Sequence, residues 1–277
     1  MISVGSLFSG IGGIELGLER SGGFKTIWFV ENEPYCQAVL RKHWPKVPIY
    51  GDIKEINFRK LPHVDMLTGG FPCQDISIAG KGEGISGKRS GLWTEYARAI
   101  RKIRPRYALI ENVPALLSRG IDTVLRDLAE AGYDAEWFTL CASDFGALHR
   151  RERIFIVAYP DSFGHERGDK KEHRKSQDGP EIQGRNIPHI ITNLWNERIQ
   201  GFKQKSLSGK QGFSWCEDVG RIEDLQNRQD IPEPLFCGSR DGVSNFVDRL
   251  KCIGNAVVPQ VAEFIGEQIM ECYELKK

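Results

Sequence analysis

One cysteine lies in the segment of this chain whose residue types most clearly suggest chemistry. Residues 69–77 read Gly-Gly-Phe-Pro-Cys-Gln-Asp-Ile-Ser, so Cys73 follows an apolar run that predicts a buried strand. The next stretch, 74–91, contains five glycines and should move as a flap. A thiol at the carboxyl end of a strand, beside such a flap, indicates nucleophilic catalysis. The alternative is a small, buried structural cysteine.

A glycine-rich turn and two carboxylates upstream predict a nucleoside pocket. The turn, Ser-Gly-Ile-Gly-Gly at 9–13, links a predicted strand to a helix, where the backbone can approach a ligand closely. Glu15 replaces the third glycine of a dinucleotide fingerprint, so the NAD pattern is not met. Glu31 ends the next strand, about 20 residues on, where a carboxylate usually takes ribose hydroxyls. Asp52 follows a third short strand and is a candidate partner for an adenine amine.

Alternating strands and helices are expected to place these residues. Over residues 1–159, short apolar runs predict strands and amphipathic stretches predict helices between them. This order favours an α/β fold with a doubly wound, mostly parallel sheet. The predicted strands are 2–8, 26–30, 65–68, 107–111, 137–141 and 154–158, and the predicted helices are 33–43, 94–103, 122–131 and 257–273.

The pattern is interrupted after residue 159. Residues 160–210 carry ten Lys/Arg and seven Asp/Glu, and residues 211–248 carry three basic and eight acidic residues, with few apolar runs. We therefore predict a catalytic domain formed by 1–159 and 249–277 and a separate loop-rich module at 160–248. A partly disordered insertion is the alternative for that module.

Composition excludes several other classes of protein. The 277 residues carry a net charge of +1, so no overall basic charge indicates nucleic acid, although a local patch remains open. Seven cysteines without a Cys-x-x-Cys pair argue against a disulfide framework and a structural zinc site. No signal peptide is visible, and no run approaches the ~18 apolar residues of a membrane helix. A cytoplasmic location is expected.

Taken in order, these motifs resemble those of the DNA (cytosine-5) methyltransferases, most of all the short phage and prophage members. The resemblance covers roughly 1–159 and 249–277, and its specificity comes from the order of seven short strings. It implies a Rossmann-like methyltransferase sheet with a small, loop-rich target-recognition module at 160–248. The strings are Phe-Ser-Gly-Ile-Gly-Gly (8–13), Glu-Asn (31–32), Gly-Asp-Ile (51–53), Pro-Cys-Gln (72–74), Glu-Asn-Val (111–113), Arg-Glu-Arg (151–153) and Gly-Asn-Ala-Val (254–257).

The resemblance also implies the cofactor and its pocket. The methyl donor would be S-adenosyl-L-methionine, with S-adenosyl-L-homocysteine as product and no metal. The residues expected to bind it are Phe8, Gly10, Ile11, Gly12, Gly13, Glu31, Asn32, Asp52, Ile53, Pro72, Leu92, Asn255 and Ala256.

Four catalytic residues follow from the same resemblance. Cys73 would attack the ring carbon beside carbon 5 of a flipped cytosine, and Glu111 would face the ring nitrogen and the exocyclic amine. Arg153 would hold the cytosine carbonyl, while Arg151 would help to anchor Glu111 and the flap. Thiolate addition turns the ring into an enamine only if an electron sink is present, so Glu111 must carry a proton and a raised pKa is expected.

Duplex DNA is the expected partner, and a restriction endonuclease acting on the same site is a second candidate. A monomer without membrane association is expected. Ser77 would contact a backbone phosphate, and the basic residues of the module are candidate phosphate contacts. The complete set of expected DNA contacts is Gln74, Ser77, Lys170, Lys171, Arg174 and Lys175.

Three departures from the family pattern leave questions open. His149 stands where the family usually has glutamine, and the arginine-rich ninth motif is not recognisable before Arg249. The short module does not reveal which DNA sequence is read. Two other functions compete, namely the same reaction on RNA and DNA binding without catalysis. The long module favours DNA, and the intact set of Cys73, Glu111 and Arg153 favours an enzyme.

Overall fold

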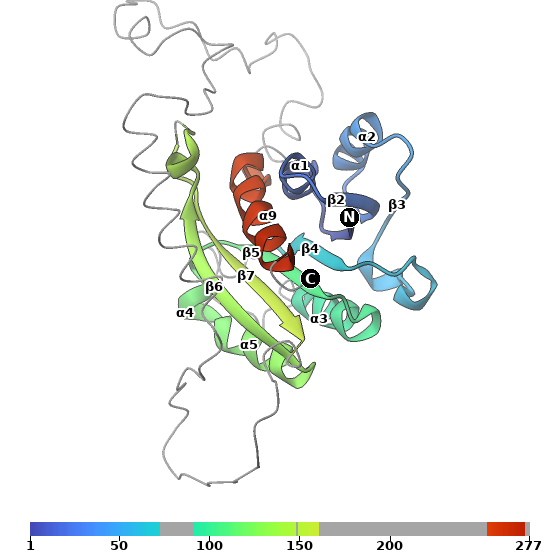
Figure 1. The fold of residues 1–277 in the computed structure, drawn as a ribbon. Helices are drawn as coiled ribbons and strands as arrows, with labels where there is room; N and C mark the ends of the chain where they lie inside the picture. The colour runs from blue at the N-terminus through green and yellow to red at the C-terminus, as the bar shows by residue number, and fades with distance from the viewer. Residues whose placement is uncertain (73–90, 148, 161–253, 275–277) are drawn as a thin grey trace, which may run out of the picture.

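A mixed seven-stranded sheet forms the centre of the protein (Figure 1). The computed structural model describes residues 1–72, 91–147, 149–160 and 254–274. The strand order is β3-β2-β1-β4-β5-β7-β6. The ladders of β7 with β5 and β6 are antiparallel and the other four are parallel, so the prediction of a mostly parallel α/β sheet is confirmed. The strands are β1 (Ile2–Leu7), β2 (Phe24–Val30), β3 (Ile49–Tyr50), β4 (Met66–Gly70), β5 (Tyr107–Asn112), β6 (Tyr133–Cys141) and β7 (Glu152–Pro160).

Helices cover both faces of this sheet, as a doubly wound fold requires. One core joins α3 and α5 to one face through Tyr96, Ile100 and Val124, and the other joins α1 and α9 to the opposite face through Leu18 and Ile265. None of the helices in the described ranges is long and apolar enough to cross a lipid bilayer. The helices are α1 (Gly13–Arg20), α2 (Pro34–His43), α3 (Leu92–Ile103), α4 (Leu116–Arg119), α5 (Ile121–Glu130) and α9 (Pro259–Glu274), and the 3₁₀ turns are η1 (Ile53–Glu55), η2 (Phe58–Lys60) and η4 (Ala142–Phe145).

The last helix returns to the first. Helix α9 lies beside α1 in Figure 1, and the two backbones approach so closely that a Cβ on Gly17 would collide with the Pro259 carbonyl oxygen. Pro259 opens α9, where its missing amide hydrogen removes no helical hydrogen bond. The far end of the chain therefore packs back against its first helix and the sheet.

The antiparallel pair of β6 and β7 differs most from the sequence prediction in where its strands begin and end. Strand β6 begins at Tyr133, four residues before the expected start at residue 137, and β7 extends the expected 154–158 by two residues at each end. The early part of β6 contains Asp134 and Glu136, which lower its apolar signal. Polar residues are tolerated there because β6 is the edge strand of the sheet.

Candidate active site

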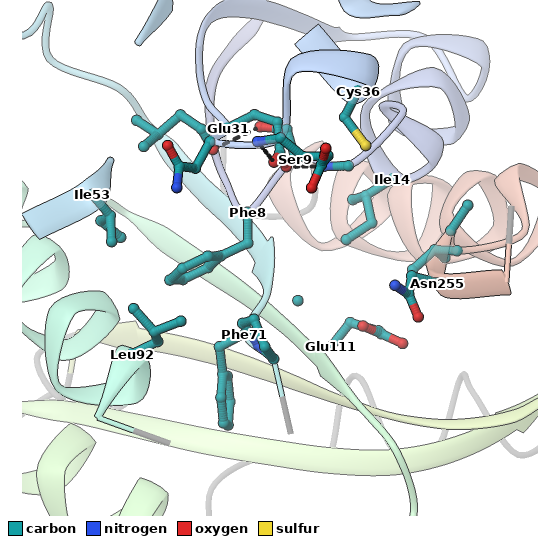
Figure 2. Close-up of a pocket in the computed structure, with 18 of the residues that line it drawn as sticks. Phe8, Ser9, Ile14, Glu31, Cys36, Ile53, Phe71, Leu92, Glu111 and Asn255 are labelled. Atoms are coloured by element: carbon teal, nitrogen blue, oxygen red, sulfur yellow. Dashed lines mark hydrogen bonds between the residues drawn. The ribbon is translucent and has the colours of Figure 1, made fainter. Parts of the chain in front are cut away.

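A cavity of about 640 Å³ opens at the carboxyl ends of β1, β2, β4 and β5. The strand order reverses direction between β1 and β4, which is the position where open α/β sheets bind their ligands. Figure 2 shows Phe8, Ile53 and Leu92 on one side of this space and Glu111 and Asn255 on the other. The cavity therefore has a partly apolar end and a separate polar end.

Thirteen of the sequence-predicted residues line this one cavity. They come from eight stretches of chain between the end of the first strand and the start of α9. They are Phe8, Gly10, Gly13, Glu31, Asn32, Asp52, Ile53, Pro72, Leu92, Glu111, Arg153, Asn255 and Ala256.

The remaining predicted residues divide into two groups. Ile11, Gly12 and Arg151 are described but do not line the cavity. The others lie outside the described residues, and they are Cys73, Gln74, Ser77, Lys170, Lys171, Arg174 and Lys175.

Each of the three glycines in the 9–13 turn is explained by a different structural feature. Gly10 has a φ of 54° and open space around it, so its backbone faces the cavity uncovered. A Cβ on Gly12, whose φ is 81°, would lie 2.6 Å from the Trp44 ring, so this glycine permits packing against the end of α2. A Cβ on Gly13 would collide with the carbonyl oxygen of Val257. The turn is thus fixed from two sides while one edge stays accessible.

Phe8 supports the turn with an unusual backbone. Its φ is 51°, in the left-handed region that bulky residues rarely adopt, and its ring lies 6.5 Å from that of Tyr96, centroid to centroid. This conformation turns the Phe8 ring toward the cavity (Figure 2). Strained residues of this kind concentrate at binding sites.

The carboxylates of Glu31 and Asp52 accept hydrogen bonds from backbone amides near the Phe8 end of the cavity. One oxygen of Glu31 accepts the Gly10 amide at 2.7 Å and the other accepts the Glu33 amide at 2.7 Å. Burial raises the pKa of Glu31, although these backbone bonds oppose the shift. Asp52 accepts the Lys54 amide at 3.0 Å and caps η1. A carboxylate offers about four lone-pair positions, so both groups can still accept a ligand donor.

Glu111 occupies the polar end, beside the end of β5. Its Oε1 accepts Nε of Arg153 at 3.1 Å, and only 8% of the residue is exposed. Burial raises the pKa of Glu111 to about 7, although the charges of Arg153 and Arg151 act in the opposite direction. The direction agrees with the proton that the sequence analysis requires on this carboxyl group.

Strand β4 passes close to the Glu111 carboxyl group, and only a residue without a side chain leaves room for it there. Gly70 pairs with Glu111 across the β4–β5 ladder, and a Cβ on Gly70 would collide with Oε2 of Glu111. Glycine at position 70 is therefore a condition for the observed position of Glu111.

Arg151 makes a contact that the sequence did not indicate. Its φ is 34°, and its Nη2 donates to the carbonyl oxygen of Ala256 at 2.6 Å, across 105 positions of sequence. The bond ties the start of β7 to the segment before α9, where Asn255 and Ala256 line the cavity. Arg151 influences Glu111 through its charge, while it donates its hydrogen bond to the carbonyl oxygen of Ala256.

Sequence reasoning missed further residues of this site. Asn112 lines the cavity, and its Nδ2 donates to the Phe71 carbonyl oxygen at 3.2 Å, which fixes the turn leading to Pro72. The Glu-Asn-Val string includes Asn112, but it does not indicate this contact. Cys36, a buried residue of α2, also lines the cavity, and nothing in its sequence context marks it. His149, the departure from the family pattern, is exposed and is not among the residues that line the cavity.

Comparison with known proteins gives a consistent result. The model of the family described as C-5 cytosine-specific DNA methylase matches residues 2–227. The type II methyltransferase M2.BsuMI of Bacillus subtilis (strain 168) is 37% identical over 305 residues, which cover 98% of this chain and 76% of the relative. M.Bsp6I of Bacillus sp. (strain RFL6) is 34% identical over 165 residues, 57% of this chain and 52% of the relative. The match thus spans about half the length of M.Bsp6I.

Solved structures support the same assignment. An E. coli prophage protein described as a DNA modification methyltransferase superimposes with a TM-score of 0.50 at 27% identity, covering 59% of this chain and 48% of that one. The Dnmt2 methyltransferase of S. pombe gives a TM-score of 0.50 at 18% identity, over 69% of this chain and 60% of that one, and shows the shared fold alone. Because the family model matches most of its length, the chain belongs to the C-5 cytosine-specific DNA methylase family.

Proposed function

We propose that this protein transfers a methyl group from S-adenosyl-L-methionine to carbon 5 of cytosine within a short duplex DNA site. The observation that carries the proposal is one continuous cavity. It joins the glycine turn, Glu31 and Asp52 at one end to the Glu111–Arg153 pair at the other. A methyl donor and an acceptor base need such a shared space, because the transferred carbon must touch both.

The first end suits an adenosine-containing ligand. The volume of the whole cavity, about 640 Å³, lies within the roughly 300–1,000 Å³ typical of small-molecule sites. Phe8, Ile53 and Leu92 offer apolar contact for a flat ring, and Glu31 and Asp52 offer acceptors for hydroxyl and amine donors. When bound there, S-adenosyl-L-methionine would supply an activated methyl group on a sulfonium. Asn255 and Ala256 would close the pocket from the α9 side.

The second end suits a cytosine ring. With a pKa of about 7, Glu111 carries a proton in a large fraction of molecules near neutral pH. The Arg153 contact engages Oε1 and leaves Oε2 for the pyrimidine. The proposed role of Glu111 is to donate that proton to the ring nitrogen as a nucleophile adds to the ring.

Cys73 is the proposed nucleophile, and it lies outside the described residues. It follows Pro72, which lines the cavity. Its thiolate would form a sulfur–carbon bond at the ring carbon next to carbon 5, and Glu111 would protonate the ring nitrogen. Carbon 5 would then take the methyl group, with S-adenosylhomocysteine as the leaving group. Loss of the carbon 5 proton to water, cleavage of the sulfur–carbon bond and return of the ring-nitrogen proton to Glu111 would release 5-methylcytosine and the thiolate. The base must leave the duplex for this reaction.

Residues 160–248 are the proposed target-recognition module. The relatives named above are type II methyltransferases, so a partner endonuclease with the same target is part of the proposal. A monomer on duplex DNA is the proposed working form.

Bisulfite sequencing of DNA from a methylation-free host that expresses the chain tests this function. The expected result is protected cytosines within one recurring short sequence, and none in cells expressing Cys73→Ser. Uniform conversion of every cytosine, with the folded protein present in the cells, would contradict the proposal.

A further inference from the structure

An arginine outside the cavity holds one of the cavity walls in place. Arg98 lies on α3 and directs its nitrogens at three acceptors. Nη2 donates to the Ile53 carbonyl oxygen at 2.8 Å, Nη1 donates to the Ile56 carbonyl oxygen at 3.0 Å, and Nε donates to Oε2 of Glu95 at 2.7 Å. Its guanidinium also lies 4.6 Å from the centre of the Phe58 ring.

The segment that Arg98 contacts has little support of its own. It follows β3, a strand of two residues, and consists of the short turns η1 and η2. Turns of this length have poorer hydrogen-bond geometry than α-helices and rarely persist without outside contacts. Ile53 is the first residue of η1, and its carbonyl oxygen accepts only the Ile56 amide within the turn, at 3.3 Å. From another element, Arg98 adds a second donor to this oxygen and also donates to the carbonyl oxygen of Ile56, the residue that ends the turn.

This same segment forms a wall of the apolar end of the cavity. Residues 51–54 line it from one side, and Leu92, at the first turn of α3, lines it from another. Because Arg98 belongs to α3 and binds the segment, it fixes the distance between these two walls. A flat ring between Ile53 and Leu92 would depend on that distance.

We propose that Arg98 is a positioning residue for cofactor binding, which orders the Asp52–Ile53 wall against α3. The proposal rests on the proposed use of S-adenosyl-L-methionine at this end of the cavity. Arg98 does not line the cavity, so it acts through the segment and leaves the Glu111 end unaltered. Lysine cannot replace it fully, because a single ammonium lacks the planar fork that reaches both carbonyls while lying on Phe58.

Three variants test the proposal. In Arg98→Ala, the Asp52–Ile53 segment loses its contacts with α3, so ligand binding itself must order it. The Kd of S-adenosylhomocysteine and the KM of S-adenosylmethionine should therefore each rise at least about tenfold. With saturating cofactor and unmethylated genomic DNA as acceptor, kcat should stay within about threefold of the wild-type value. The Arg98→Lys variant should give values of the Kd and the KM between those of wild type and Arg98→Ala. Arg101→Ala removes an exposed charge from the same helix and should change neither constant.

The outcomes separate the two proposals. Calorimetry on the full chain gives the Kd, and circular dichroism gives the melting temperature of each variant. If wild-type protein bound no S-adenosylhomocysteine, the proposed function and the role of Arg98 would both fail. If wild-type protein bound it and Arg98→Ala bound equally well, only the role of Arg98 would be wrong. An equal loss of kcat and affinity in the alanine and lysine variants, with lowered melting temperatures, would show a general structural role instead.

Discussion

At the scale of single residues, the site depends on a balance of burial and charge at Glu111. Two arginines favour the ionised carboxylate, yet burial outweighs them and raises the pKa to about 7. The bare backbone of Gly70 lets β4 approach the carboxyl group closely and contributes to that burial. Desolvation is therefore the larger effect at this position, and it prepares a carboxyl group that can exchange a proton at neutral pH.

This balance predicts a pH-dependent cost to folding. Glu111 has a higher pKa in the folded chain than in the unfolded chain, so its contribution to stability is complete below about pH 4.5 and is lost as pH rises through about 7. In Glu111→Gln this loss is absent. The unfolding free energy of the variant minus that of wild type should grow by up to about 3 kcal/mol between pH 4.5 and 8.

Urea denaturation across this pH range measures the difference. The exposed Glu130, at the end of α5, provides the matched control, because Glu130→Gln should show no such trend. A difference between Glu111→Gln and wild type that did not change with pH would mean that folding leaves the pKa of Glu111 unchanged, which contradicts the raised value.

Residue roles were predictable from the sequence only where a short string carried them. Glu111, Arg153 and Asp52 stand in such strings, and the structure places all three at one cavity. Arg98 and Asn112 were not predictable, because their partners lie 45 and 41 positions away in sequence and are backbone carbonyl groups. A carbonyl oxygen has no side-chain identity, so no sequence pattern marks it as an acceptor.

At the scale of elements, the contact between α1 and α9 holds the two ends of the chain together. Gly17 faces Pro259, Ala262 and Glu263 with no room for a side chain. The α9 segment also brings Asn255 and Ala256 to the cavity, where Arg151 binds the carbonyl oxygen of Ala256. The packing of two helices therefore supports one wall of the site.

Gly17→Ala should lower the free energy of unfolding by about 1–3 kcal/mol, because the added methyl group must push α9 away from α1. Thermal or urea denaturation measures the change. Arg20→Ala, an exposed change on the same helix, is the control and should stay within about 0.5 kcal/mol of wild type. Unchanged stability of Gly17→Ala would show that the helices can separate without cost.

The sequence predicted the central strands better than the edge hairpin. Strands β4 and β5 are covered on both faces, so nearly all their residues are buried and each begins with a short apolar run, at 66–67 and 107–110, that marks its position. Strand β6 lies at the edge and alternates polar with apolar residues, so only its last part was recognisable. The predicted helices over 33–43, 94–103 and 122–131 all exist within two residues of their expected ends.

At the scale of the whole molecule, the order of strands brings distant motifs to one opening. Residues near positions 10, 31, 52, 71, 111, 153 and 255 meet at the carboxyl ends of β1 and β4, where the strand order reverses direction. The family assignment, the fold and the cavity therefore agree. The division into a catalytic domain and a recognition module at 160–248 stays a prediction, since that module lies outside the described residues.

The central claim is that Cys73, which follows the cavity residue Pro72 in the sequence, attacks a cytosine, and covalent trapping tests it most directly. Duplex DNA that contains 5-fluorocytosine in the target found by bisulfite sequencing should hold the protein after methyl transfer, because fluorine cannot leave as the proton does. Intact mass analysis should show one DNA strand and one methyl group attached per chain, with peptide mapping to Cys73. No adduct with active wild-type protein, or an equal adduct with Cys73→Ser, would contradict the account.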